Sequence, residues 1–256
     1  MQNLWRTFSK IPSRPYAFRQ LDEATSTGSH ALPYHVVFRQ QATSTEPLHL
    51  FPPLPFAALK RLIDIVGALA GIIIFGLPLL YLMYKIKQDG GPALFKQQRV
   101  GQQGKPFWCW KLRSMKMNAE AELQTLLQQN PALANHYKAF RKLPHDPRVT
   151  PIGRIIREYS LDELPQLFNV LRGDMSLVGP RPILPTEKAE YGTYIKYYHT
   201  VKPGITGLWQ TQGRNNLTFQ ERVALDKHYV LQRSLWLDIT ILVRTFYVVM
   251  LRKGAL

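Results

Sequence analysis

Two adjacent carboxylates, Asp162 and Glu163, stand in the stretch SLDELPQLFNVLRG, residues 160–173. An ionised carboxylate can attack phosphorus if cations offset the repulsion between the two anions, and a neighbouring carboxylate can bind a metal ion or move a proton. Ser-Leu-Asp-Glu is also the capping-box pattern that begins many helices. Evidence that the pair is catalytic must therefore come from other parts of the chain.

The position of Pro165 favours one of two starts for the helix that follows this pair. With Ser160 as the N-cap, Pro165 would be the fifth helical residue and would lose an intrahelical hydrogen bond. With Asp162 as the N-cap, Pro165 falls in the first turn, where no such bond is lost. We therefore predict a helix that begins at Asp162 and ends at Gly173. Its N-terminal dipole and free N–H groups would stabilise the carboxylate and attract phosphate.

Several cationic side chains are candidate ligands of the phosphate that this nucleophile would attack. Lys111 and Arg113 belong to the strand-like sequence FWCWKLR, where a period of two puts both on one face. A solvated strand edge that faces lipid headgroups is the alternative. Arg157 precedes Asp162 by five residues, and Arg181 stands in a Pro-Arg-Pro sequence, a stiff extended turn that would present it to a phosphate.

A turn-rich segment follows at residues 201–216, VKPGITGLWQTQGRNN. It contains Trp209, Gln210 and Arg214 among glycine and asparagine residues, which favour turns. We predict a loop that covers a base or a sugar.

One apolar segment is long enough to cross a membrane. Residues 62–84 contain a single charge, Asp64, and a bilayer core needs about 20 helical residues. Pro78 would kink or break this helix, and basic residues flank both of its ends. A kinked spanning helix and a helix that re-enters the same leaflet are both compatible with these features.

Composition narrows the class of protein. The 256 residues contain 33 Lys and Arg against 17 Asp and Glu, a net charge of +16, which indicates an anionic partner: nucleic acid, a membrane surface or a phosphorylated substrate. The single cysteine, Cys109, excludes an intrachain disulfide and is predicted to be buried in an apolar strand. The seven histidines lack zinc-site spacing.

These patterns divide the chain into three parts. We predict an irregular tail at residues 1–57, a membrane helix at 58–88 and a catalytic domain at 89–256. Within the domain, Pro131 predicts two short helices over residues 119–142. The apolar end of the chain, from residue 235 onward, is either an amphipathic helix in the membrane interface or a packed core helix.

Four long motifs carry a resemblance that covers about residues 58–256: KRLIDIV, QRVGQQGKPFWCWKLRSM, DPRVTPIGRIIREYSLDELPQLFNVLRGDMSLVGPRP and VKPGITGLWQTQGRN. Their order resembles the bacterial sugar transferases, the monotopic polyprenyl-phosphate phosphoglycosyl transferases. Within that family they are most similar to undecaprenyl-phosphate galactose or glucose phosphotransferases. The resemblance implies a mostly helical α/β fold with a re-entrant membrane helix, a small cytoplasmic catalytic domain and interfacial amphipathic helices.

The resemblance also implies a reaction. A UDP-sugar would donate a sugar-1-phosphate to undecaprenyl phosphate at the cytoplasmic face of the bacterial inner membrane, with release of UMP, to begin a lipid-linked surface polysaccharide. Asp162 matches the family's nucleophile, Glu163 completes its Asp-Glu dyad, and Mg²⁺ is the cofactor expected at Asp162. Lys111, Arg157 and Arg181 match basic positions of the phosphate site, and Arg113 is a weaker candidate. A homodimer is permitted.

The family's membrane helix is re-entrant and broken at a proline, which favours re-entry at Pro78. This chain departs from the usual Ser-Pro pair, because Gly76 and Leu77 precede the proline. Two other classes of protein are alternatives: a basic nucleic-acid-binding protein and a membrane scaffold without enzymatic activity. A soluble nucleic-acid binder has no use for the apolar segment, so we expect no nucleic-acid partner.

Overall fold

The computed structural model of the chain describes residues 54–140, 143, 145–212 and 217–250, all within one unit, His49–Leu256. Most of the predicted tail therefore lies outside the described residues. The predicted boundary of the tail at residue 57 is wrong, because residues 54–57 already belong to the long helix α2, Leu54–Lys87.

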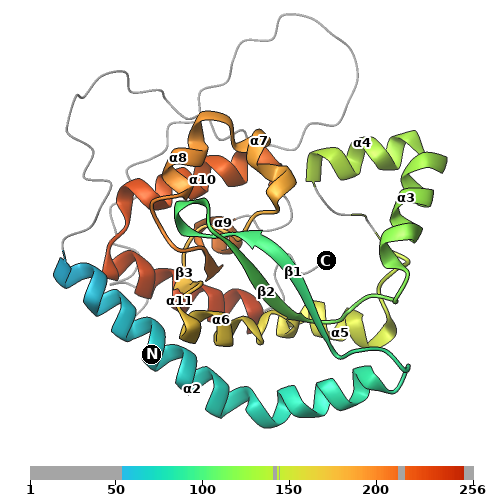
Figure 1. Cartoon of the computed structure of the whole chain (residues 1–256), viewed down its shortest axis with the longest axis horizontal. Coiled ribbons are helices and arrows are strands. Elements are labelled where there is room, and N and C mark those ends of the chain that lie inside the picture. Colours follow the sequence, from blue (N-terminus) through green and yellow to red (C-terminus); the bar gives the residue numbers. More distant parts are fainter. Residues whose placement is uncertain (1–53, 141–142, 144, 213–216, 251–256) are drawn as a thin grey trace, which may run out of the picture. The chain divides into compact units, whose positions relative to one another are not determined.

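A β-hairpin follows α2 and crosses the middle of the unit in Figure 1. Its strands, β1 (Leu94–Val100) and β2 (Pro106–Leu112), pair antiparallel and are joined by the 3-10 turn η1, Gln102–Gly104. The strand predicted from FWCWKLR is thus confirmed. Cys109 is 2% exposed and packs against Leu167 and Val170 of α6, as predicted for a cysteine in a buried strand.

Helices and two short strands complete the described residues. In chain order they are α3 (Ala119–Gln129), α4 (Pro131–Phe140), α5 (Pro151–Glu158), η2 (Leu161–Glu163), α6 (Gln166–Arg172), β3 (Ser176–Val178), η3 (Pro185–Glu187), α7 (Lys188–Tyr191), η4 (Gly192–Tyr194), α8 (Ile195–Tyr198), β4 (Gly204–Thr206), α9 (Leu208–Gln212), α10 (Phe219–Gln232) and α11 (Leu235–Met250). Strands β3 and β4 pair in parallel. The prediction of a mostly helical α/β chain is confirmed, as is the division of residues 119–142 into two helices at Pro131.

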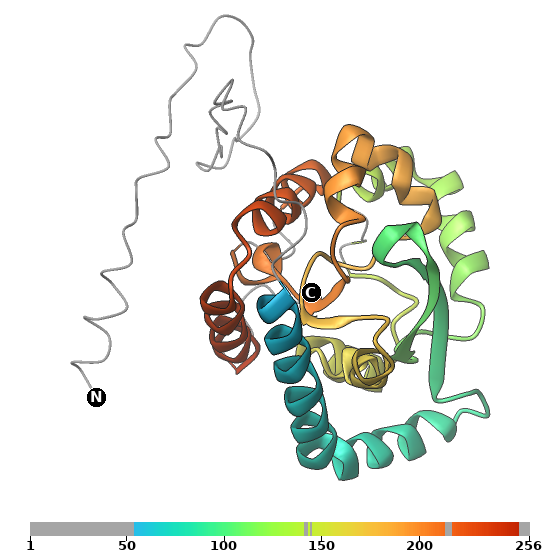
Figure 2. The same cartoon turned by 60° about the vertical axis from the view of Figure 1, so that its left-hand side comes forward.

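The helix α2 is continuous through Pro78 but bent, as Figures 1 and 2 show from two directions. A proline removes one helical hydrogen bond and bends a helix without having to end it. The helix therefore does not break at Pro78, where the sequence allowed either a kink or a break. Among the described residues, α2 is the one helix long and apolar enough to cross a membrane.

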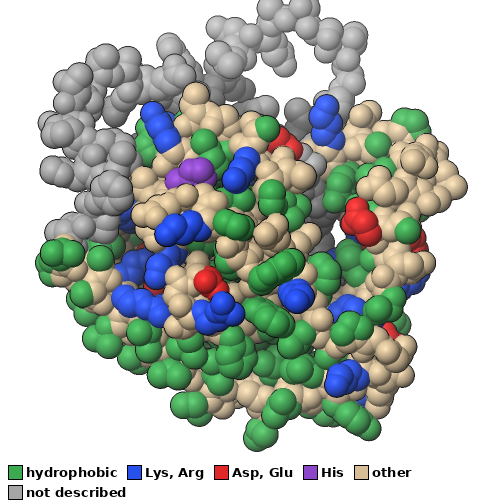
Figure 3. All heavy atoms as spheres, viewed as in Figure 1, with side chains coloured by type: hydrophobic (Ala, Val, Ile, Leu, Met, Phe, Trp, Pro, Cys, Tyr) green, Lys and Arg blue, Asp and Glu red, His purple; other side chains and the backbone are tan. Residues whose placement is uncertain are grey.

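Both limbs of α2 pack against the rest of the unit. On the first limb, Ala68 and Ile72 join the core cluster of α6 and β2. On the second limb, Met83 and Ile86 join a different cluster, which contains Ile156 of α5. Between these contacts the helix exposes apolar side chains: Ile73, Ile74, Leu77 and Leu80. Figure 3 shows hydrophobic side chains gathered along this edge of the unit.

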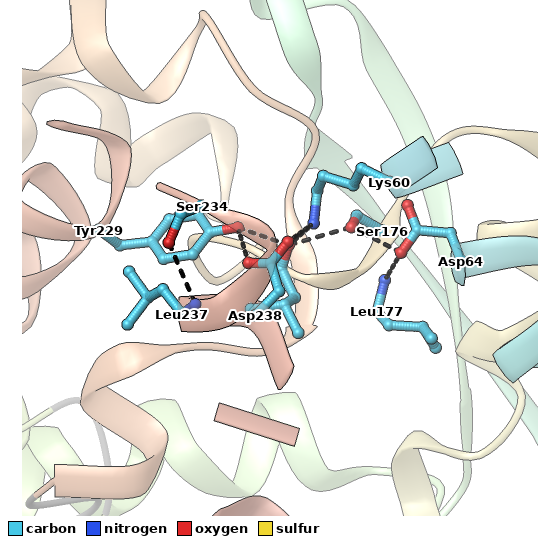
Figure 4. A network of polar contacts seen from close by, with 9 residues as sticks. Lys60, Asp64, Ser176, Leu177, Tyr229, Ser234, Leu237 and Asp238 are labelled. Atoms are coloured by element: carbon cyan, nitrogen blue, oxygen red, sulfur yellow. Dashed lines mark hydrogen bonds and ion pairs between the residues drawn. The ribbon is translucent and has the colours of Figure 1, made fainter. Parts of the chain in front are cut away.

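A buried polar network fastens the first limb of α2 (Figure 4). Asp64 is only 4% exposed. It accepts hydrogen bonds of 2.9 Å from the Ser176 hydroxyl and from the backbone N–H of Leu177. One turn earlier, Lys60 Nζ lies 2.6 Å from Asp238 Oδ2 of α11, whose other oxygen accepts from the Tyr229 hydroxyl at 2.7 Å. A buried polar group is stable only when it is hydrogen-bonded, so the two donors to Asp64 explain how the apolar segment can contain one acidic residue.

The helix α11 has a core face and an apolar outer face, the two alternatives that its sequence left open. Asp238 and Ile241 are buried and face the core. The opposite face exposes apolar side chains: Trp236, Ile239, Val243, Phe246 and Met250. One face of α11 is therefore a core face, and its outer face has the composition of a membrane-interface surface.

Candidate active site

The carboxylate pair lies in the 3-10 turn η2 rather than at a helix N-cap. Ser160 precedes the turn in the left-handed conformation, with φ of 56°, and its side chain makes no capping bond. The helix α6 begins only at Gln166, directly after Pro165. The predicted cap at Asp162 is wrong, because the chain leaves α5 through the left-handed Ser160 and enters a tighter turn first. Gly173, with φ of 91°, ends the helix as predicted.

Lys111 of β2 contacts both carboxylates. Its Nζ lies 2.7 Å from Glu163 Oε1 and 3.7 Å from Asp162 Oδ2. The side chains of all three residues are partly buried, which strengthens these contacts relative to surface ion pairs. The two acidic groups raise the pKa of Lys111 above its ordinary value despite its burial, so it stays a cation.

The pKa values of the two carboxyl groups shift in opposite directions. Burial raises the pKa of Asp162, and the positive charges of Lys111 and Arg157 offset only part of this effect. Burial also acts on Glu163, but the close contact with Lys111 outweighs it and lowers the pKa of Glu163. Opposite shifts in adjacent acids are typical of a site where the two groups have different tasks.

Arg157 belongs to α5, a helix whose Thr150 N-cap accepts a hydrogen bond from Gly153 N at 3.0 Å. A Cβ on Gly153 would overlap the backbone of Ser114, so glycine permits the close approach of α5 to the end of β2. Arg157 Nε then donates a hydrogen bond of 2.9 Å to the Ser114 hydroxyl. This bond holds the guanidinium of Arg157, whose positive charge acts on Asp162.

Arg181 lines a cavity that opens to solvent, together with Lys111 and Glu163. Its segment has no regular secondary structure, in agreement with the extended turn predicted from the flanking prolines. The guanidinium lies over the Trp209 ring, 5.9 Å from its centroid. The cations predicted from three separate motifs, Lys111, Arg157 and Arg181, thus converge on the acidic pair.

Trp209 and Gln210 line the same cavity, but they belong to the short helix α9. Trp209 is only 5% exposed, and Arg222 lies 4.8 Å from its ring centroid. These two residues therefore lie in a helix of the cavity wall rather than in the predicted loop, and their role at a base or a sugar stays a prediction. Arg214 lies outside the described residues.

Arg113 is placed elsewhere, and the predicted phosphate-binding pair of Lys111 and Arg113 is wrong. Strand β2 ends at Leu112, so the alternation that the prediction used no longer holds at Arg113. Its guanidinium binds Asp89 and the Ile86 carbonyl at the end of α2. This contact lowers the pKa of Asp89 to about 2.

The sequence reasoning missed two buried residues that line the cavity, Arg99 and Gln166. Arg99 pairs across the hairpin with Phe107, so the alternation within β1 places it on the same face as Cys109 and Lys111. The pairing of the hairpin would have revealed Arg99. No local signal identifies Gln166, because it resembles any polar residue at a helix start.

The donor set fits the expected magnesium ion. The described residues contain no group of three or more His, Cys, Asp or Glu that could hold a metal ion. Magnesium at phosphate-transfer sites often uses only one or two carboxylates, and substrate phosphates and water supply the other ligands. Asp162 and Glu163 provide that number, and magnesium stays a prediction.

Most of the chain is similar in sequence to known proteins. Residues 56–252 match the family model described as bacterial sugar transferase. The chain is 51% identical over 197 residues to the undecaprenyl-phosphate galactose phosphotransferase of Salmonella typhimurium, covering 77% of this chain and 41% of that protein.

Two further relatives are similar over more of their own length. The exopolysaccharide production protein ExoY of Sinorhizobium fredii is 41% identical over 197 residues, or 77% of this chain and 87% of that protein. The UDP-glucose:undecaprenyl-phosphate glucose-1-phosphate transferase of Caulobacter vibrioides is 40% identical over 216 residues, or 79% and 75% of the two chains. The first relative is more than twice as long as the region it shares, so this chain spans about two fifths of its length.

Proposed function

Because the chain belongs to the bacterial sugar transferase family, we propose that it transfers a sugar-1-phosphate from a UDP-sugar to undecaprenyl phosphate. Galactose and glucose are the favoured sugars, since relatives are named for both. The observation that carries the proposal is the contact of Lys111 with both Asp162 and Glu163 beside a cavity that Arg181 also lines. An acidic pair among converging cations suits the attack of one anion on another.

In the proposed first step, an Asp162 oxygen attacks the phosphorus nearer the sugar. The bond between this phosphorus and the bridging oxygen breaks, and UMP leaves with the electron pair. The product is a phospho-sugar held covalently on Asp162. In the second step, a phosphate oxygen of undecaprenyl phosphate attacks the same phosphorus and releases Asp162, which gives undecaprenyl-diphospho-sugar.

The residues around the pair have separate tasks in this proposal. Lys111 and Arg157 favour the ionised form of Asp162 against the effect of burial, and Arg181 offsets the charge of the phosphates. Mg²⁺ held by Asp162 and Glu163 would neutralise further phosphate charge. The acceptor is already an anion, so its attack requires no strong base.

The bent helix α2 supports membrane attachment at a single face. Its two limbs pack against different clusters of the same unit, while the residues between them expose apolar side chains. A spanning helix would carry one of its ends to the opposite side of the bilayer. We therefore propose a re-entrant helix and a catalytic domain at the cytoplasmic face of the inner membrane.

The test is UMP release by the purified full chain with Mg²⁺ and a panel of UDP-sugars. We expect release with UDP-galactose or UDP-glucose, a labelled phospho-sugar adduct on the protein, and transfer of the label when undecaprenyl phosphate is added. Asp162→Asn should remove both release and adduct, while Asp174→Asn, a change near the surface after α6, is the matched control. Full UMP release by Asp162→Asn would refute the assignment.

A further inference from the structure

Four side chains that line the cavity each carry a buried polar atom without a hydrogen-bond partner among the described residues. The atoms are Arg99 Nε, Gln166 Nε2, Trp209 Nε1 and Gln210 Oε1. Buried polar atoms are nearly always paired, and each unpaired one costs roughly 1–3 kcal/mol. Four of them around one cavity indicate that a bound molecule completes their hydrogen bonds.

The chemistry of these atoms favours hydroxyl groups over phosphate. Three of them are N–H donors and one, the oxygen of Gln210, is an acceptor. Phosphate oxygens can only accept, whereas a hydroxyl group both donates and accepts. Arg99 donates from one terminal nitrogen to the Pro182 carbonyl at 3.0 Å and from the other to Gln97 at 2.6 Å, while its Nε–H is the donor without a partner.

The burial of Trp209 argues against a nucleotide base as the occupant. A base is normally bound by stacking on an exposed aromatic ring. Trp209 is only 5% exposed, and the guanidinium groups of Arg181 and Arg222 lie over its ring. The ring is therefore not an exposed surface on which a base could stack.

The position of the cavity also favours the sugar over the base as its occupant. Lys111 and Glu163 of the acidic site line it, so the occupant is next to the attacked phosphorus. In a UDP-sugar, the sugar is bonded directly to this phosphate, whereas the uracil is separated from it by the ribose and a second phosphate.

We infer that Arg99, Gln166, Trp209 and Gln210 form the pocket that binds the hydroxyl groups of the donor sugar and so determine which sugar is transferred. The inference rests on the proposed function, because it takes a UDP-sugar as the donor. Arg99 and Gln166 are specificity-determining residues in it, and the amide of Gln210 distinguishes sugars by the direction of one hydroxyl group.

Equilibrium binding tests this inference without turnover. The full chain with Asp162→Asn, which cannot react, is titrated with UDP, UDP-glucose and UDP-galactose in the presence of Mg²⁺. Three variants are compared in this background: Gln166→Leu, Gln210→Leu and Trp209→Phe. The control is Gln212→Leu, which changes an exposed glutamine on the same helix as Gln210. A melting temperature measured for each variant establishes that it is folded. The three variants test the inference independently, because they change different positions in the cavity wall.

We expect the pocket variants to weaken binding of a UDP-hexose about tenfold, and to change UDP binding less than twofold. The ratio of the Kd values for UDP-glucose and UDP-galactose should also change, while the control alters neither value. Equal weakening of UDP and the UDP-hexoses would place the base or a phosphate in the cavity and overturn the inference, as would unchanged binding in all folded variants. A parent protein that binds none of the three ligands would instead refute the proposed function itself.

Discussion

Lys111 donates a hydrogen bond of 2.7 Å to Glu163, and the same ammonium group lies 3.7 Å from the neighbouring Asp162. One cation from the hairpin therefore controls the ionisation of two acids in a turn 52 residues away in the sequence. Burial opposes the effect of its positive charge on both carboxyl groups: burial prevails at Asp162, whose pKa is raised, and the charge prevails at Glu163, whose pKa is lowered.

Loss of this charge should change the pH profile of the reaction. In Lys111→Met the pKa of Asp162 should rise further, so that less of the carboxylate is ionised at a given pH and the acid limb of kcat/KM moves to higher pH. We expect a loss of roughly 100-fold at neutral pH, by analogy with the removal of one charge-stabilising donor. Lys111→Arg keeps the charge and should retain the position of the acid limb. An acid limb that does not move in Lys111→Met would contradict this assignment.

Arg113 should matter for stability and not for chemistry. It is 7% exposed and binds Asp89 and backbone carbonyls at the end of α2. Arg113→Gln should lower the free energy of unfolding by roughly 1–3 kcal/mol, because buried acceptors lose their partner. The exposed pair of Arg172 and Asp174 is a matched control, and Arg172→Gln should cost less than about 1 kcal/mol. A folded Arg113→Gln protein with a strongly reduced kcat would show that Arg113 takes part in the reaction and would contradict this prediction.

Asp226 should make stability dependent on pH. It is buried beneath α7, accepts a 2.9 Å hydrogen bond from the Tyr191 hydroxyl, and burial raises its pKa to about 8. Between the unfolded-state pKa near 3.8 and this value, the folded protein holds a proton that the unfolded chain has lost, so stability falls as pH rises. The slope is up to about 1.4 kcal/mol per pH unit.

The isosteric Asp226→Asn has no such proton. Relative to this variant, the free energy of unfolding of the wild-type protein should fall from about pH 4 to pH 8. The difference between the two free energies should be constant below and above that window. Thermal unfolding at a series of pH values measures the difference. Parallel curves for the two proteins over the whole range would show that Asp226 titrates normally.

The re-entrant arrangement of α2 predicts the same sidedness for its two ends. Cysteines placed at Leu54 and Lys87 should react with an impermeant maleimide only in inverted membrane vesicles. A cysteine at Ile73, which is 81% exposed in the protein but expected to lie in lipid, should stay unlabelled from either side. The native Cys109 is buried and its burial raises the pKa of its thiol, so it should not react. Labelling of the two ends from opposite sides would indicate a spanning helix.

Local sequence determined the parts that depend on short-range rules. The alternation of FWCWKLR predicted strand β2, Gly173 predicted the end of α6, Pro131 separated two helices, and the apolar run predicted α2. Each of these signals acts within a few residues through backbone geometry or hydrophobic periodicity, so no tertiary contact was required to recognise it. The adjacent acids and the nearby basic motifs also predict an anionic substrate, which stays a prediction.

The tertiary structure decided which residues meet. Lys111 and Arg113 are two residues apart, yet one reaches the acidic pair and the other the end of α2, because the strand ends between them. Arg99 and Gln166 become neighbours of the site only through the hairpin pairing and the packing of α6 against it. Which cations face a nucleophile, and which side chains enclose a cavity, depends on contacts between distant segments, and single-sequence patterns do not contain that information.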